Sequence, residues 1–167
     1  GTAGALAHLR SWIDGRGVLV LNSDTWAPGD LRPAAEGWDR RRVRLLVAGD
    51  DRLRPTSLLA GAFMPWSEVV RLEPVPSGLW EASWRAALDD GRVDLVRWDG
   101  VCLDCGTPAR YLRANLTASE GASVIGDGAV VEGTVERTVL WPGARVHRSE
   151  ALVDAVRTGG DVTVLVR

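Results

Sequence analysis

Two aspartates, Asp24 and Asp104, each follow a short apolar stretch and have the chemistry to bind a cation. Asp24 comes after the run 17–21 (GVLVL), and Asp104 comes after 101–103 (VCL). Mg²⁺ in proteins is held by one or two carboxylates, and phosphate oxygens and water complete its shell. Two aspartates that each end a strand therefore predict a Mg²⁺ site that also binds substrate phosphates.

The element expected to position Asp24 is a buried strand. Residues 18–21 are consecutive aliphatics, typical of a strand that is buried on both faces in a parallel sheet. Ligands of open α/β sheets bind at the carboxyl ends of the strands, where Asn22 and Asp24 would lie. Alternatively, these two side chains form an Asx turn and cap the next segment. The sequence of 17–25 fits both interpretations.

The segment after Asp104 has the residues of a tight turn and a helix start. Gly106 suits the turn, Thr107 is a preferred N-cap residue, and Pro108 suits the first helical position. We therefore expect Asp104 to lie between a short strand and a helix.

Several stretches together resemble the sugar-nucleotide pyrophosphorylases, nucleotidyltransferases that join a sugar 1-phosphate to a nucleoside triphosphate. In chain order they are GTAGAL (1–6), VLVLNSDTW (18–26), LDCGTPARYLRAN (103–115), GASVIGDGAVVEGTV (121–135) and VLWPGARV (139–146). The most specific feature is DCGTP..YL.AN followed by hexapeptide-like repeats. Residues 41–75 fit the family least well.

This resemblance implies a reaction and its substrates. An oxygen of the sugar 1-phosphate attacks the α-phosphorus of the nucleoside triphosphate, and pyrophosphate leaves. Positioning and charge neutralisation by Mg²⁺ supply most of the catalysis. Asp24 and Asp104 would bind the metal and act as the catalytic residues.

The resemblance also implies substrate contacts elsewhere in the chain. Thr2 and Gly4 would lie near the base or the ribose. Free N–H groups at a helix N-terminus favour anions and acceptors, although a flexible start to a helix explains residues 1–4 equally. Asn22 and Gly106 would bind substrate as well, because the small Gly106 would let the backbone approach the sugar phosphate.

The predicted fold is α/β and has two domains. Residues 1–118 are expected to form a nucleotidyltransferase domain, with a partial doubly wound, Rossmann-like and mostly parallel sheet. Residues 119–167 are expected to form a short left-handed β-helix, because small aliphatics recur at hexapeptide spacing. The spaced residues are Val124, Val130, Val135, Trp141, Val146 and Leu152. Only about two coils fit, so this part would pack on its own domain, on a partner subunit or in a homo-oligomer.

Apolar patterns predict the other elements. Helices are expected over 5–13, 30–39, 67–72, 78–88 and 150–157. Strands are expected over 43–47, 58–64 and 162–166, and a hairpin is expected between 93–98 and 101–103.

The composition excludes several classes of protein. The chain of 167 residues is 46% hydrophobic and 25% charged, with a formal net charge of −2. Neither nucleic acid nor a membrane is an expected partner, since there is no basic excess and no long apolar run. Cys102 and Cys105 are too few for a disulfide scaffold, which favours the cytoplasm. They have no second pair or histidine partner at zinc-site spacing.

All 20 basic residues are arginine, and the sequence contains no lysine. The resembled family begins with a G-x-G-T-R loop ahead of a phosphate-binding lysine, and this sequence shows neither. We therefore expect the chain to correspond to the C-terminal two-thirds of such an enzyme and to be inactive as given. The alternative is a non-catalytic, pyrophosphorylase-like binding or regulatory module. A hexapeptide-repeat acyltransferase is disfavoured, because about two coils cannot form a trimeric groove.

Overall fold

A computed structural model describes residues 1–50, 52–54, 56–159 and 162–166, and the chain forms two compact units. Unit 1 comprises Gly1–Ser23 and Ala27–Cys102, and unit 2 comprises Asp24–Trp26 and Leu103–Arg167. Among the described residues, no helix is long and apolar enough to cross a membrane.

The division differs from the predicted boundary between residues 118 and 119. Helix α5 (Pro108–Ala118) lies in unit 2. Its Leu112 is buried against Val139 and Val156. The helix therefore packs on the C-terminal strands, which the periodicity of its own sequence does not reveal.

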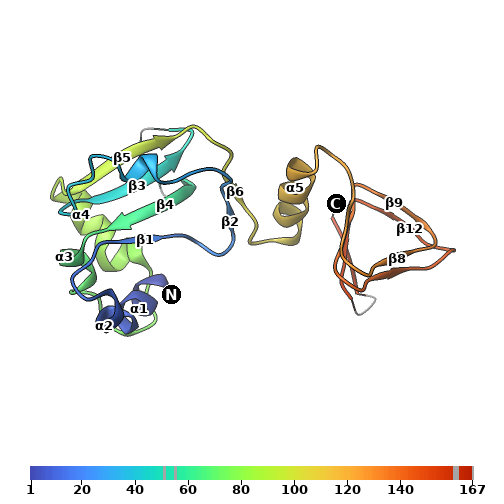
Figure 1. The fold of residues 1–167 in the computed structure, drawn as a ribbon, viewed down its shortest axis with the longest axis horizontal. Coiled ribbons are helices and arrows are strands. Elements are labelled where there is room, and N and C mark those ends of the chain that lie inside the picture. The colour runs from blue at the N-terminus through green and yellow to red at the C-terminus, as the bar shows by residue number, and fades with distance from the viewer. Residues whose placement is uncertain (51, 55, 160–161, 167) are drawn as a thin grey trace. The chain divides into compact units, whose positions relative to one another are not determined.

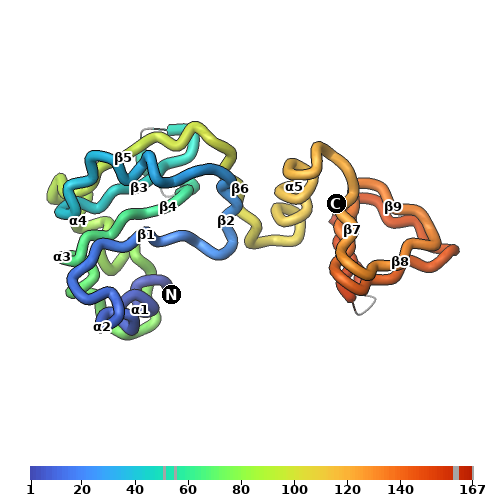
Figure 2. Tube along the Cα trace, viewed as in Figure 1, coloured from blue at the N-terminus to red at the C-terminus, as the bar shows by residue number. Residues whose placement is uncertain are grey.

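Unit 1 is built on a four-stranded mixed sheet (Figures 1 and 2), in the order β1-β4-β3-β5. The strands are β1 (Val18–Val20), β3 (Val43–Ala48), β4 (Leu59–Met64) and β5 (Val93–Trp98). Only β3 and β5 are parallel, and β4 runs antiparallel to both β1 and β3. The strands expected over 43–47, 58–64 and 93–98 are confirmed, but the sheet is mixed rather than mostly parallel.

The prediction that 18–21 lies buried in the middle of the sheet is wrong. Strand β1 lies at an edge and pairs only with β4. Leu19 is 40% exposed and Leu21 is 54% exposed, whereas Leu45 of β3 is fully buried. An aliphatic run shows that a strand is apolar, but its place in the sheet depends on partners distant in sequence.

Short helices complete unit 1. They are α1 (Thr2–His8), α2 (Arg10–Ile13), the 3₁₀ helix η1 (Pro33–Ala35), α3 (Trp66–Val69), the π-helix η2 (Trp80–Trp84) and α4 (Arg85–Asp89). The main core contains Ile13, Val43, Leu45, Val47, Met64 and Val69, among others. The helices expected near 5–13, 67–72 and 78–88 therefore form, with interruptions and shorter bounds.

The predicted helix over 30–39 is wrong, since only η1 forms there. Asp30 does not cap a helix, because its carboxylate accepts the Arg32 backbone N–H within an Asx turn. The Arg44 guanidinium donates hydrogen bonds to backbone carbonyls at residues 34, 36 and 37, at 2.8–3.2 Å. A side chain from β3 thus takes the place of the helical hydrogen bonds.

Unit 2 begins with a pair of two-residue strands. Strand β2 (Thr25–Trp26) runs antiparallel to β6 (Leu103–Asp104), and Thr25 lies opposite Asp104. The predicted hairpin between 93–98 and 101–103 is therefore wrong. The Trp98 indole instead donates a hydrogen bond to the Val101 carbonyl at 3.2 Å.

The chain then runs through three parallel ladders (Figure 1), which are β7-β10-β13, β8-β11 and β9-β12. The strands are β7 (Val124–Ile125), β8 (Val130–Val131), β9 (Thr134–Glu136), β10 (Val139–Leu140), β11 (Arg145–Val146), β12 (Ala151–Val153) and β13 (Ala155–Arg157). β14 (Thr163–Leu165) runs antiparallel to β13 and confirms the expected last strand.

The core of the ladders agrees with part of the hexapeptide pattern. Val146 and Leu152 are buried, but Trp141 is 45% exposed and its neighbour Leu140 is buried in its place. The predicted helix over 150–157 is wrong, because β12 and β13 continue the parallel ladders there. The left-handed β-helix itself stays a prediction.

Candidate functional site

The β2–β6 ladder brings Asp24 and Asp104 together in unit 2. Asp24 directly precedes β2, and Asp104 is the last residue of β6. The Cys105 backbone N–H donates a hydrogen bond to the Asp24 carbonyl at 2.6 Å. Backbone pairing therefore fixes the two aspartates beside each other, although 80 positions separate them in the sequence.

Gly106 lies against both carboxylates. A Cβ atom added at Gly106 would lie 3.1 Å from Asp104 Oδ1 and 3.2 Å from Asp24 Oδ2. The two oxygens can be no farther apart than the sum of these distances. Both therefore face one small space, which is open because residue 106 has no side chain.

The two carboxylates differ in their hydrogen bonds. Asp104 Oδ1 accepts the Gly106 backbone N–H at 2.7 Å, and Asp104 Oδ2 pairs with Arg110 Nη1 at 2.5 Å. Asp24 is exposed, and its carboxylate accepts no hydrogen bond from any residue that the structure describes. One carboxylate is thus oriented and partly neutralised, and the other is free to bind a ligand.

The helix start predicted after Asp104 is confirmed. Thr107 is the N-cap of α5, and its hydroxyl accepts the Arg110 backbone N–H at 3.3 Å. Pro108 occupies the first helical position. This cap fixes the backbone of Arg110 in the first turn, within reach of Asp104.

Thr2 and Gly4 lie elsewhere, in helix α1 of unit 1. Gly4 is buried, and a Cβ atom on it would lie 2.3 Å from the Val75 carbonyl oxygen. The Ala3 backbone N–H donates to the Ser77 carbonyl at 3.1 Å. Close packing against the 75–77 backbone therefore accounts for Gly4, and a substrate contact of Thr2 or Gly4 stays a prediction.

Asn22 also lies in unit 1, and it is exposed. It lines a small hollow together with Val20, Leu59, Gly61, Ala62 and Trp84. Of the six predicted site residues, the structure groups Asp24, Asp104 and Gly106 in unit 2 and places the other three in unit 1.

Sequence reasoning missed Arg110. Its side chain makes the one ion pair to Asp104 among the described residues. The available signal was the type of residue, because the first turn of a helix favours acidic side chains and α5 has none there.

The donor set fits a hard cation that receives its other ligands from outside the chain. The described residues contain no group of three or more histidine, cysteine, aspartate or glutamate side chains that could hold a metal. Two converging carboxylates are sufficient for Mg²⁺ when phosphate and water complete the shell.

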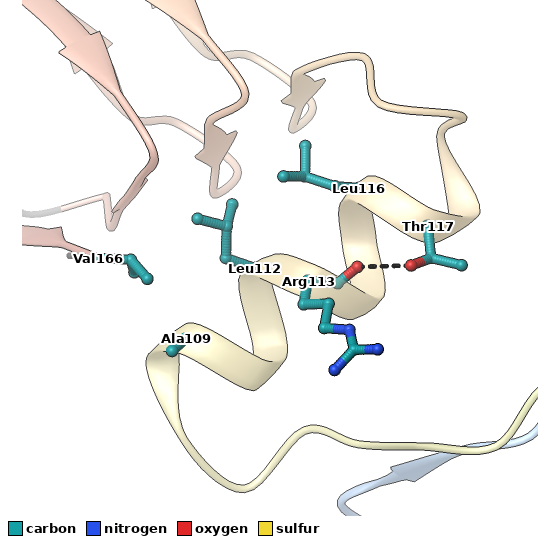
Figure 3. Close-up of a pocket in the computed structure, with 6 residues that line it drawn as sticks. All are labelled: Ala109, Leu112, Arg113, Leu116, Thr117 and Val166. Carbon is teal, nitrogen blue, oxygen red and sulfur yellow. Dashed lines mark hydrogen bonds between the residues drawn. The ribbon is translucent and has the colours of Figure 1, made fainter.

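A second hollow of unit 2 lies along α5 (Figure 3). It is lined by Ala109, Leu112, Arg113, Leu116, Thr117 and Val166. The Thr117 hydroxyl donates to the Arg113 carbonyl at 2.9 Å, and Arg113 is the charged residue of the lining. This hollow has no carboxylate, so it does not suit a cation.

Similar proteins agree with the resemblance. A glucose-1-phosphate adenylyltransferase from Geobacillus stearothermophilus is 33% identical over 72 residues, which are 42% of this chain and 18% of that protein. One from Clostridium beijerinckii is 27% identical over 93 residues, or 54% of this chain and 22% of that protein. The matches thus span about a fifth of these relatives. No protein-family model matches the chain.

Solved structures share the fold. A putative glucose-1-phosphate thymidylyltransferase from Bacillus anthracis, in complex with sucrose, has a TM-score of 0.56 at 15% identity, over 71% of this chain and 61% of that one. A UDP-glucose pyrophosphorylase from Acinetobacter baumannii has 0.54 at 18% identity, over 70% and 55%. A protein titled mannose-1-phosphate geranyltransferase, from Thermus thermophilus, has 0.53 at 15% identity, over 98% and 70%.

The fold is a mixed α/β fold shared with sugar-1-phosphate nucleotidyltransferases. The resemblance to the sugar-nucleotide pyrophosphorylases is confirmed, as a partial and distant homology.

Proposed function

We propose that the chain is part of an enzyme that transfers a nucleotidyl group from a nucleoside triphosphate to a sugar 1-phosphate, giving an NDP-sugar and pyrophosphate. The partial homology to glucose-1-phosphate adenylyltransferases supports the reaction class. The observation that supports the site is the convergence of the Asp24 and Asp104 oxygens on the open space at Gly106.

Asp24 and Asp104 would hold Mg²⁺ in this site. Bound there, the ion would neutralise charge on the phosphate oxygens of the substrates. The Gly106 N–H orients the Asp104 carboxylate, and the missing side chain of Gly106 leaves room for a phosphate group. Asp24 contributes an unpaired carboxylate, so a cation can bind it without breaking a hydrogen bond within the chain.

The other substrate contacts belong to the same proposal. Thr2 and Gly4 would lie near the base or the ribose, and Asn22 would contact substrate at the end of β1. The parallel ladders would form a left-handed β-helix that joins this chain to a second copy or to a partner subunit. The cytoplasm is the proposed location.

A non-catalytic, pyrophosphorylase-like binding or regulatory module is the second candidate. The lysine-free sequence favours it, because a triphosphate needs several positive groups to neutralise its charge. Such a module would bind sugar phosphate or nucleotide without releasing pyrophosphate.

Metal binding and its distance from a sugar phosphate test the proposal. Mn²⁺, which takes the same oxygen ligands as Mg²⁺, can be titrated into the chain and followed by electron paramagnetic resonance. Bound Mn²⁺ should broaden the ³¹P signal of glucose 1-phosphate, and Asp24→Asn and Asp104→Asn should abolish this broadening.

Asp127→Asn provides the matched control, since Asp127 is an exposed aspartate of unit 2. If Asp24→Asn and Asp104→Asn bind Mn²⁺ as the unmodified chain does, the proposed metal site is wrong. Pyrophosphate release from a nucleoside triphosphate by the longer enzyme, and its loss in Asp24→Asn, would separate catalysis from a binding module.

A further inference from the structure

Arg110 occupies a helical position that does not suit its charge. It is the third residue of α5, after the N-cap Thr107, in a first turn without acidic residues. The helix dipole favours negative groups in this turn, and a threonine N-cap is often followed by glutamate or glutamine at this position. A residue that breaks such a local rule is expected where function requires it.

The side chain of Arg110 neutralises one of the two site carboxylates. Arg110 Nη1 lies 2.5 Å from Asp104 Oδ2, and the Gly106 N–H binds the other oxygen at 2.7 Å. Both oxygens of Asp104 therefore have a partner within the chain. A cation that bridges Asp24 and Asp104 would have to compete with the guanidinium, because like charges repel at this distance.

Arg110 has unused hydrogen-bonding capacity. Its side chain is 59% exposed, and its other guanidinium N–H groups donate to no residue that the structure describes. A guanidinium presents its donors in a planar fork that matches two phosphate oxygens. In a chain without lysine, arginine is the residue that can supply this contact.

We infer that Arg110 is a positioning residue that exchanges partners. It holds Asp104 while the site has no cation, and it moves to a phosphate oxygen of the sugar 1-phosphate when a divalent cation binds Asp104. This inference rests on the proposed function. It predicts that cation and phosphate favour each other's binding through Arg110.

The test is a Mn²⁺ titration of the 167-residue chain with and without glucose 1-phosphate, followed by electron paramagnetic resonance of free Mn²⁺. In Arg110→Gln the cation no longer competes with a guanidinium, so Mn²⁺ alone should bind about 10-fold more tightly. Glucose 1-phosphate should then enhance Mn²⁺ binding less than it does in the unmodified chain. Arg113→Gln is the matched control, because it removes an exposed arginine of α5 and should change neither value.

Arg110→Lys provides a second variant, and circular dichroism shows whether each variant is folded. Lysine keeps the charge but not the fork, so Mn²⁺ alone should still bind weakly and the enhancement by phosphate should fall. Unchanged or weaker Mn²⁺ binding in folded Arg110→Gln would overturn the inference. If Asp24→Asn and Asp104→Asn abolish Mn²⁺ binding while Arg110→Gln has no effect, only the role of Arg110 is wrong. If both aspartate variants bind Mn²⁺ normally, the proposed function fails as well.

Discussion

Replacing Gly106 with alanine tests whether the carboxylates of Asp24 and Asp104 form one site. The added methyl group would lie 3.1 Å from an oxygen of Asp104 and 3.2 Å from an oxygen of Asp24. Both distances are shorter than ordinary van der Waals contact, so each carboxylate must move by a few tenths of an ångström. The methyl group would also fill the space that a cation and a phosphate oxygen need.

The expected effect is on ligand binding and not on folding. A displacement of 1 Å at a site can cost about 100-fold, so the smaller shift here should weaken Mn²⁺ binding about 10-fold, or about 1.4 kcal/mol. Gly106 is exposed, and its backbone is outside the left-handed region. Alanine at such a position lowers the entropy of the unfolded chain by about 0.4–1 kcal/mol, which offsets the crowding.

Mn²⁺ titration and thermal unfolding of the same sample measure the two effects. Cys105→Ala is the matched control, because it changes the neighbouring residue without placing an atom between the carboxylates. Gly106→Ala that binds Mn²⁺ as tightly as the unmodified chain would show that the two carboxylates do not share a ligand. Loss of binding together with a large fall in Tm would mean that the turn itself depends on glycine.

Three further predictions concern stability. Gly4→Ala would place a methyl group 2.3 Å from the Val75 carbonyl oxygen, so overpacking should lower the free energy of unfolding by about 1–3 kcal/mol, measured by urea unfolding. Glu68 is buried and ion-paired with Arg92, whose side chain is 35% exposed, so Glu68→Ala should cost about 2 kcal/mol, less than a fully buried pair. The Arg137 guanidinium lowers the pKa of Asp154 below its ordinary value of 3.8, mainly through their hydrogen bonds. A lowered folded-state pKa contributes stability above the unfolded-state pKa, and this is lost as the pH falls through the folded value. Arg137→Gln should therefore begin to unfold at a higher pH on acid titration, followed by circular dichroism.

Each of these variants has an exposed counterpart. Ala5→Ser, Glu73→Ala and Arg148→Gln change exposed residues and should leave stability within about 0.5 kcal/mol of the unmodified chain. A buried variant that behaves like its counterpart would contradict the packing or ion pair on which its prediction depends. For Arg137→Gln, the contradicting result is an acid transition at an unchanged pH.

The sequence predicted the segment after Asp104 correctly because its interactions are local. The cap joins Thr107 to Arg110, three residues on, and Gly106 donates to Asp104, two residues back. Such contacts follow from the order of residue types. The chemical type of the site residues was therefore accessible before any fold was known.

The failures have a common physical cause in partners distant along the chain. The run 18–21 is apolar, but only its pairing with β4 makes it an edge strand. Arg44 satisfies the carbonyls of 34–37, which a helical pattern would pair internally. Residues 151–157 pair with β9 and β10, so a pattern with helical spacing becomes two strands. The role of Arg110 was missed for the same reason, since an arginine in a helix gives no sign of the carboxylate it contacts.

The strand pair β2–β6 explains why the two aspartates can be tested by substitution. Residues 24–26 belong to unit 2 although both flanking segments belong to unit 1, and their partners there are Leu103 and Asp104. Backbone hydrogen bonds, including the one from the Cys105 N–H to the Asp24 carbonyl, hold the pair together. An asparagine at position 24 keeps every one of these bonds, because the Asp24 carboxylate takes no part in them. Loss of Mn²⁺ binding in Asp24→Asn can therefore be assigned to the lost charge, while a matching loss in Asp104→Asn also includes the broken ion pair with Arg110.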